Sequence, residues 1–281
     1  MKAYIKNTVI IALLAIGVCS CQKAEYVNSF KEFVDVYFDA DKTALRDNGA
    51  GVFIALRYNG HPSDWDAANK KIRVVPGEGK FEFYDTRDGK VVARKMIDVK
   101  PGSKEMFTLF QPTMDAPVAF IDPNAQNAES PAPEGHIKVK VANYAQDLIP
   151  FERLDIKVSI SYYDVDWNEV VKEIGIIKNV KNSVDKAEYH ILPDGLPNPL
   201  PDLPCNYVFE FVDSETGQPL LNHGGTNYAN MAFSPAGMDP LPSKNIFTLY
   251  MISRETWGEA PPFIKKGDTF YEIATNVLFA N

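Results

Sequence analysis

The strongest constraint on the fold of this chain is an internal repeat. The ten residues Phe81–Lys90 match Phe209–Gln218 at five positions, and the eight residues Ser103–Phe110 match Ser243–Tyr250 at five positions. The blocks occur in the same order in both copies, with about twelve more residues between them in the second copy. Such repetition indicates one structural unit built twice, so we expect the extra residues to form a loop.

Apolar and polar residues alternate in several short segments of both copies, and this period is typical of β-strands that bury one face of an antiparallel sheet. Turn signals such as Asp88-Gly89 and Pro101-Gly102 separate these segments. Strands at this spacing, without long helices between them, indicate β-sandwiches. The clearest segments are Lys80–Tyr84, Ile137–Val141, Asp155–Ser161 and Val208–Val212.

The first copy resembles a known repeat. Val75-Pro-Gly, then Lys80-Phe-Glu-Phe with an Asp-Gly turn, then Val99-Lys-Pro-Gly-Ser and Met106-Phe-Thr-Leu-Phe, resemble an Ig-like β-sandwich repeat of unassigned function. That repeat is common in cell-surface lipoproteins of anaerobic Gram-negative bacteria, often in tandem. The resemblance covers about 72–112 well and about 189–252 more loosely, and it implies no catalytic residue.

The N-terminus resembles the signal peptide of a bacterial lipoprotein. Lys2 and Lys6 precede an apolar stretch that is too short to span a bilayer. The run Val18-Cys19-Ser20-Cys21 resembles a lipobox, where a signal peptidase cuts before a cysteine that then carries lipid. Cys21 is the expected lipidation site because the preceding Ser20 is small. An ordinary cleaved signal with incidental cysteines is the alternative.

These features predict an all-β chain with two tandem Ig-like antiparallel β-sandwich domains after a lipoprotein signal peptide. The Pro, Ala, Asn and Glu content of 115–134 is typical of a linker. We expect a signal peptide at 1–20, a lipidated tether at 21–25, a first sandwich at 26–114, the linker at 115–134, and a second sandwich with Pro-rich insertions at 135–281.

Charge and cysteine content bear on the compartment and on the partners. Without Lys2 and Lys6, the formal net charge falls from −8 to −10. A surface this acidic repels phosphate backbones and anionic headgroups, so nucleic acid is not an expected partner. Once Cys21 carries lipid, Cys205 is the one thiol left in the folded region, and no intramolecular disulfide is expected there. We expect the protein in the outer membrane, held by its lipid and facing the surface or the periplasm.

No sequence motif identifies a reaction. The four histidines are scattered without a second ligand at metal spacing. His223-Gly224-Gly225 is similar to the oxyanion loop of lipases, but the chain has no Gly-x-Ser-x-Gly. Asp164–Glu169 starts like a calcium loop, but it lacks the glycine at the sixth position and the glutamate at the twelfth. We therefore expect no enzyme activity, no metal site and no cofactor.

Two tryptophans lie in segments with helical signals. Asp166 and Glu169 form a capping box before apolar residues at helical spacing, which predicts a short helix that ends at Gly175. Ser63–Asp66 predicts a comparable helix that starts around Trp65. In this interpretation, each helix packs its tryptophan against its own sandwich.

The alternative is that exposed aromatic rings bind sugars, with nearby carboxylates and amides binding hydroxyl groups. Trp257 is the leading candidate because it lies in a stretch without strand periodicity; the other candidate ligand-binding residues are Trp167, Tyr163 and Trp65. The leading hypothesis is a non-catalytic binding or structural module on the membrane, with a glycan or a protein as partner. The two others are a glycan-binding accessory protein of a polysaccharide-uptake system and a fimbrial or adhesin subunit that exchanges strands.

Overall fold

The structure is a computed structural model that describes residues 32–46, 51–122, 125–150, 152–194, 205–223, 226–235, 238, 242–256 and 264–281. Strands dominate these residues, and the short helix η1 (Ala125–Ala128) is the one helix that lies wholly within them. The prediction of an all-β fold is confirmed. The signal peptide, the tether and Cys21 lie outside the described residues.

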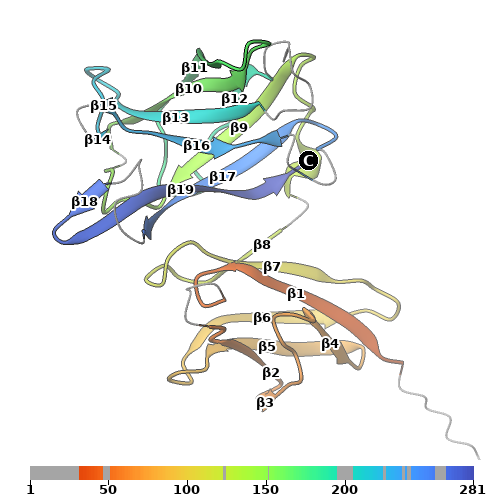
Figure 1. Cartoon of the computed structure of the whole chain (residues 1–281). Coiled ribbons are helices and arrows are strands. Elements are labelled where there is room, and N and C mark those ends of the chain that lie inside the picture. Colours follow the sequence, from red (N-terminus) through yellow and green to blue (C-terminus); the bar gives the residue numbers. More distant parts are fainter. Residues whose placement is uncertain are drawn as a thin grey trace, which may run out of the picture.

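The first half of the chain forms two facing sheets (Figure 1). Strands β1 and β7 pair in parallel, and the other neighbouring strands pair antiparallel. Phe38, Phe81 and Phe83 are fully buried between the sheets. One sheet has the order β4 (Lys71–Val74), β1 (Val34–Thr43), β7 (Met106–Gln111) and β8 (Ala119–Ile121), and the other β3 (His61–Pro62), β2 (Ile54–Tyr58), β5 (Gly77–Asp85) and β6 (Val91–Val99).

The second half repeats this plan around its own core. Strands β9 and β17 pair in parallel, as β1 and β7 do. A small ribbon, β14 (Asn222–His223) and β15 (Thr226–Asn227), is added to the two sheets. The sheets have the orders β12 (His190–Pro193), β9 (His136–Asn143), β17 (Ile246–Glu255), β19 (Thr269–Ala280), β18 (Ile264–Lys266), and β11 (Glu169–Ile177), β10 (Leu154–Tyr163), β13 (Asn206–Asp213), β16 (Ala229–Phe233).

The repeated residues occupy equivalent positions in the two halves. In the first half, Phe83 of β5 lies opposite Leu56 of β2. In the second half, the matching Phe211 of β13 lies opposite Ile156 of β10. Both phenylalanines are fully buried. The alternation that marks these strands in the sequence therefore marks the face that each turns toward its core.

The repeated Asp-Gly turns also have the same geometry. Gly89 donates its N–H to Asp85 O at 2.8 Å, and Gly217 donates to Asp213 O at 2.7 Å. Both glycines have positive φ angles, 76° and 68°. A side chain at that φ would crowd the backbone, so the glycine is needed to close each turn.

Both predicted short helices are wrong. Residues 169–177 form strand β11, which pairs with β10 over eight residue pairs. The cross-strand bonds and side-chain contacts of β10 outweigh a capping box, whose contribution is about 1 kcal/mol. Around Trp65 the chain forms a tight turn, in which Asp66 Oδ1 accepts the N–H groups of Ala68 and Asn69 at 2.7 and 2.8 Å. Asp66 caps this turn as a helix cap would, but no helix follows.

The segments expected to be linker and loop contain some regular structure. Within 115–134, β8 pairs with β7 and extends the first sheet, and η1 follows. The extra residues of the second copy include the ribbon β14–β15. The Pro-rich stretch at 195–204 lies outside the described residues. The predicted domain boundaries stay a prediction.

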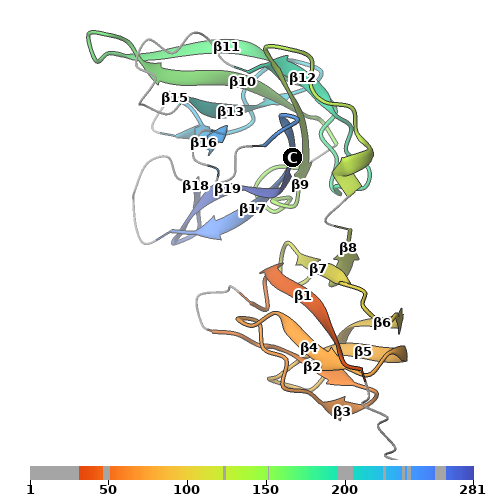
Figure 2. The same ribbon diagram turned by 90° about the vertical axis from the view of Figure 1, so that its right-hand side faces the viewer.

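Strands β7 and β8 lie on the side of the first half that faces the second half (Figures 1 and 2). The two halves meet there in a small apolar cluster at their junction. Phe110 of β7 lies edge-on to Tyr250 of β17, with ring centroids 5.0 Å apart, and to Tyr144, at 5.7 Å. Lys42 donates a hydrogen bond to Val277 O at 3.0 Å across the same junction. Because Phe110 and Tyr250 are matching positions of the repeat, equivalent strands of the two halves meet here.

Candidate functional site

The structure describes three of the four predicted ligand-binding residues, and Trp257 lies outside the described residues. Trp65 is only 4% exposed and packs edge-on against Phe83, with ring centroids 5.2 Å apart. A ring enclosed in the first core cannot stack on a sugar, so the candidacy of Trp65 as a binding residue is wrong. The competing prediction, that Trp65 packs inside its sandwich, is confirmed.

Trp167 and Tyr163 lie together at the end of the β10–β11 hairpin, which extends from the upper sheet in Figure 2. Trp167 is 68% exposed and Tyr163 is 44% exposed. Their ring centroids are 6.4 Å apart and the ring planes are inclined by 45°. The expected packing of Trp167 on its sandwich is wrong, because the hairpin carries this ring beyond the sheet. Val165 between them is exposed too; we call Tyr163, Val165 and Trp167 the aromatic tip.

A network of bonds to Asp164 holds the turn of this tip. Its Oδ1 accepts the backbone N–H groups of Asp166 and Asn168, both at 2.9 Å. The Asp164 N–H donates to Asn168 O, and the Trp167 N–H donates to Asp164 O, each at 3.0 Å. The hydrogen bond from the Asn168 N–H is the main reason that the pKa of Asp164 is lowered. The tip is therefore a closed, pre-organised turn.

Trp167 adopts an uncommon backbone conformation within that turn. Its φ is 61°, in the left-handed region that Gly and Asn occupy most easily. A bulky residue there costs about 1–2 kcal/mol, and the exposed ring recovers little of this cost by packing. Folding alone therefore does not account for a tryptophan at this position. Strain at an exposed aromatic ring is typical of a residue kept for binding.

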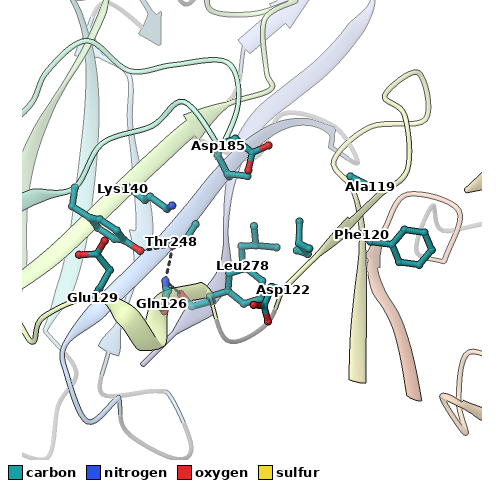
Figure 3. Close-up of a pocket in the computed structure, with 13 residues that line it drawn as sticks. Ala119, Phe120, Asp122, Gln126, Glu129, Lys140, Asp185, Thr248 and Leu278 are labelled. Carbon is teal, nitrogen blue, oxygen red and sulfur yellow. Dashed lines mark hydrogen bonds between the residues drawn. The ribbon is translucent and has the colours of Figure 1, made fainter. Parts of the chain in front are cut away.

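A second feature, which sequence reasoning missed, is a pocket of about 350 Å³ at the junction of the halves (Figure 3). Lys140 of β9, Thr248 of β17 and Gln126 of η1 line it, together with Ala119 of β8. The ring of Phe120, also on β8, is directed away from these groups in Figure 3. It packs with Phe38 and Phe107 of the first core.

Lys140 is the cationic group of this junction pocket. Its Nζ lies 4.9 Å from the ring centroid of Tyr189. Burial lowers the pKa of Lys140, while the negative charges of Asp185 and Glu129 act in the opposite direction. Within the described part of the chain, no carboxylate lies within ion-pair distance of Lys140. The nearby Lys138, by contrast, is 3.3 Å from Glu129.

Gln126 is a buried polar residue of the pocket, with 3% of its surface exposed. Its Nε2 donates to Thr248 Oγ1 at 2.5 Å and, at 3.4 Å, to Phe279 O. Its Oε1 is buried and accepts no hydrogen bond. An unsatisfied buried carbonyl costs about 1–3 kcal/mol, so it is rarely retained without a partner. The helical signal around Gln126 is too short to be read from the sequence.

The described residues contain neither a cluster of metal-ligating side chains nor a membrane-spanning helix. Among them, no three His, Cys, Asp or Glu side chains lie close enough together to hold a metal ion. No helix in the same residues has the length and apolar character needed to cross a membrane.

Comparison with known proteins finds faint structural likenesses only. No protein-family model and no curated protein matches the chain. Among solved structures, family 41 carbohydrate-binding modules from streptococcal virulence factors, described as recognising alpha-glucan, match with 12% identity and a TM-score of 0.19, over 78% of this chain and 93% of theirs. A candidate adhesin from Bacteroides ovatus matches with 8% identity and a TM-score of 0.23, over 85% and 94%. At these TM-scores the likenesses assign neither a ligand nor an activity to this chain.

Proposed function

We propose that this chain is a non-catalytic, lipid-anchored binding protein of the outer membrane, and that it binds glycans through the aromatic tip. The exposure of Trp167 in a strained conformation next to Tyr163 carries the proposal. Lipidation at Cys21 would tether the two sandwiches to the membrane and leave the tip free to meet a ligand.

The chemistry of the tip favours a neutral, hydroxyl-rich ligand. The faces of Tyr163 and Trp167 can stack on the C–H faces of sugar rings. Asp166 and Asn168 flank Trp167 in the same turn and supply polar groups that can bind hydroxyls. The net charge of −10 without the leader disfavours anionic surfaces as partners.

Binding without cleavage fits the carboxylates of the tip. A glycosidase needs one carboxylic acid with a raised pKa to protonate the leaving oxygen. Asp164 has the opposite property, because the backbone N–H of Asn168 lowers its pKa. The Glu169 carboxylate accepts a hydrogen bond from Ser161 at 2.7 Å. Both groups serve the hairpin itself.

The test is a titration of the chain from Gln22 onward with a panel of polysaccharides. We expect Trp167→Ala and Tyr163→Ala to weaken binding at least tenfold, since each removes a stacking surface. Met231→Ala is the matched control, because Met231 is equally exposed on β16 but lies outside the tip. Trp257→Ala tests the remaining sequence candidate separately. Unchanged affinity in both tip variants would remove the tip from the site.

A second candidate function is a fimbrial or adhesin subunit that pairs strands with a neighbour. Strand β11 is at the edge of its sheet, and Val171 and Ile176 are exposed along it. Such an edge can add a strand from another chain. Native membrane extracts would then contain polymers, and Val171→Lys would disperse them. Extracts that contain monomers alone contradict this function.

A further inference from the structure

The junction pocket holds polar groups that the proposed function does not use. It lies between β8 of the first half and strands β9 and β17 of the second half, away from the aromatic tip on the β10–β11 hairpin (Figures 1 and 3). Its volume of about 350 Å³ is at the lower end of the range for small-molecule sites, roughly 300–1,000 Å³. A pocket of this volume suits a small molecule better than a polymeric ligand.

Among the described residues, this pocket contains one hydrogen-bond acceptor that has no donor and one cationic donor that has no ion-pair partner. Gln126 Oε1 is a buried acceptor without a donor. Lys140 Nζ is a half-buried donor without an ion-pair partner in the described residues. The Gln126 amide is oriented by its hydrogen bond to Thr248, so the free acceptor is held in place. A matching ligand must donate to the first group and accept from the second.

The charge around the pocket selects among such ligands. Asp122, Glu129 and Asp185 line it with Lys140, so its formal charge is negative. An anion would be repelled and would leave Gln126 Oε1 without a donor. A simple cation would leave Lys140 without an acceptor. A hydroxyl group both donates and accepts, so a neutral polyol meets both requirements.

We infer that the junction pocket is a binding site for a small neutral sugar, held by Gln126 and Lys140. This site is separate from the aromatic tip and does not depend on the proposed function. The bound sugar contacts both halves, because Ala119 belongs to β8 and Lys140 to β9. Occupation of the pocket would therefore stiffen the junction.

The first test uses calorimetric titration of the chain from Gln22 onward. The probes are the methyl glycosides of glucose, galactose, mannose and N-acetylglucosamine, with methyl glucuronoside as an anionic probe. We expect saturable binding of at least one neutral glycoside and weaker binding of the glucuronoside. Failure of all four neutral glycosides to bind, or tighter binding of the anion, overturns the inference.

Variants then locate the site. We expect Lys140→Met and Gln126→Met each to weaken binding at least tenfold. Lys157→Met is the matched control, since Lys157 lies on β10 and outside the pocket. Trp167→Ala disables the aromatic tip, so glycoside binding that persists in this variant and is lost when Lys140→Met is added separates the pocket from the proposed function. Equal affinity in the original chain and in Lys140→Met overturns the inference.

A third measurement uses the unsubstituted chain, so its result does not depend on whether a variant folds. An N-hydroxysuccinimide ester of acetate modifies accessible amines, and mass spectrometry follows each lysine separately. The bound glycoside should slow acetylation of Lys140 at least threefold and leave Lys157 unaffected. Equal acetylation rates of Lys140 with and without a saturating glycoside overturn the inference.

Discussion

Trp167 combines exposure with backbone strain. Its φ of 61° suits asparagine better than tryptophan, because asparagine adopts the left-handed region at lower cost. The other non-glycine residues with positive φ include Asn59, Asn179 and Asn245, which follow this preference. Lys70 and Trp167 depart from this preference, and Trp167 has the bulkier side chain of the two.

Replacing Trp167 by asparagine should therefore stabilise the protein and abolish tip binding. We expect Trp167→Asn to raise the free energy of unfolding by about 1 kcal/mol, since the strain is relieved and little packing is lost. Urea denaturation followed by Tyr and Trp fluorescence measures this. Trp167→Ala is the control that removes the ring without favouring the turn. A lower stability in Trp167→Asn would show that the indole ring supports the hairpin.

Asp213 predicts a pH dependence at the residue scale. Backbone N–H donation from Thr216 and the ion pair with Arg153 lower its pKa to about 2. A carboxyl whose pKa is lower in the folded state adds stability above its unfolded pKa, about 4, and loses it as the pH falls toward 2. Stability should therefore decrease between about pH 4 and pH 2.

The Asp213→Asn variant isolates that contribution. An amide oxygen still accepts the backbone N–H groups but does not titrate, so the loss of stability between about pH 4 and pH 2 should be smaller than in the original chain. Thermal melts at a series of pH values measure both proteins. Identical pH profiles would exclude Asp213 as a contributor.

At the scale of elements, local signals predicted the strands well and the helices badly. The alternation in β5, β10 and β13 reports directly which side chains face a core, because each strand has one buried face. The segment after Asp166 has both helical spacing and β-branched residues. The segment is a strand because it pairs with β10. Neither of the two local patterns includes the residues of β10, so neither could predict this pairing.

The duplicated Asp-Gly turns give a matched pair of variants. Gly89→Ala and Gly217→Ala should each destabilise the protein by about 1–2 kcal/mol, because alanine is strained at positive φ. Neither glycine faces a close contact that an added Cβ would strike, so strain in the backbone is the cause. Chemical denaturation compares the two. An effect in one turn alone would show that the turns are not equivalent.

At the scale of the whole molecule, the junction links two similar cores. Phe110 is almost fully buried there, between Tyr144 and Tyr250. Its neighbour Leu109 belongs instead to the core of the first half. Adjacent residues of β7 thus serve two different interfaces, since successive side chains of a strand point to opposite faces.

Phe110→Ala should uncouple the halves. Removal of this ring costs about 3 kcal/mol of packing at the junction, while both cores stay intact. We expect calorimetry to resolve two unfolding transitions in Phe110→Ala where the original chain has one. Leu109→Ala is the control that lowers the stability of the first half from inside its core. A single unshifted transition in Phe110→Ala would contradict coupling through this ring.

The sequence by itself determined the strands, the turns and their duplication, because alternation and glycines at positive φ act over a few neighbouring residues. It also singled out Tyr163 and Trp167, but it placed Trp167 on a helix. Only the tertiary structure decided that this ring is exposed and that Trp65 is buried. It also created the junction pocket, since Thr248 is 122 positions away from Gln126 in the chain and is brought beside it by folding. Their partners are supplied by long-range packing, which no local pattern encodes.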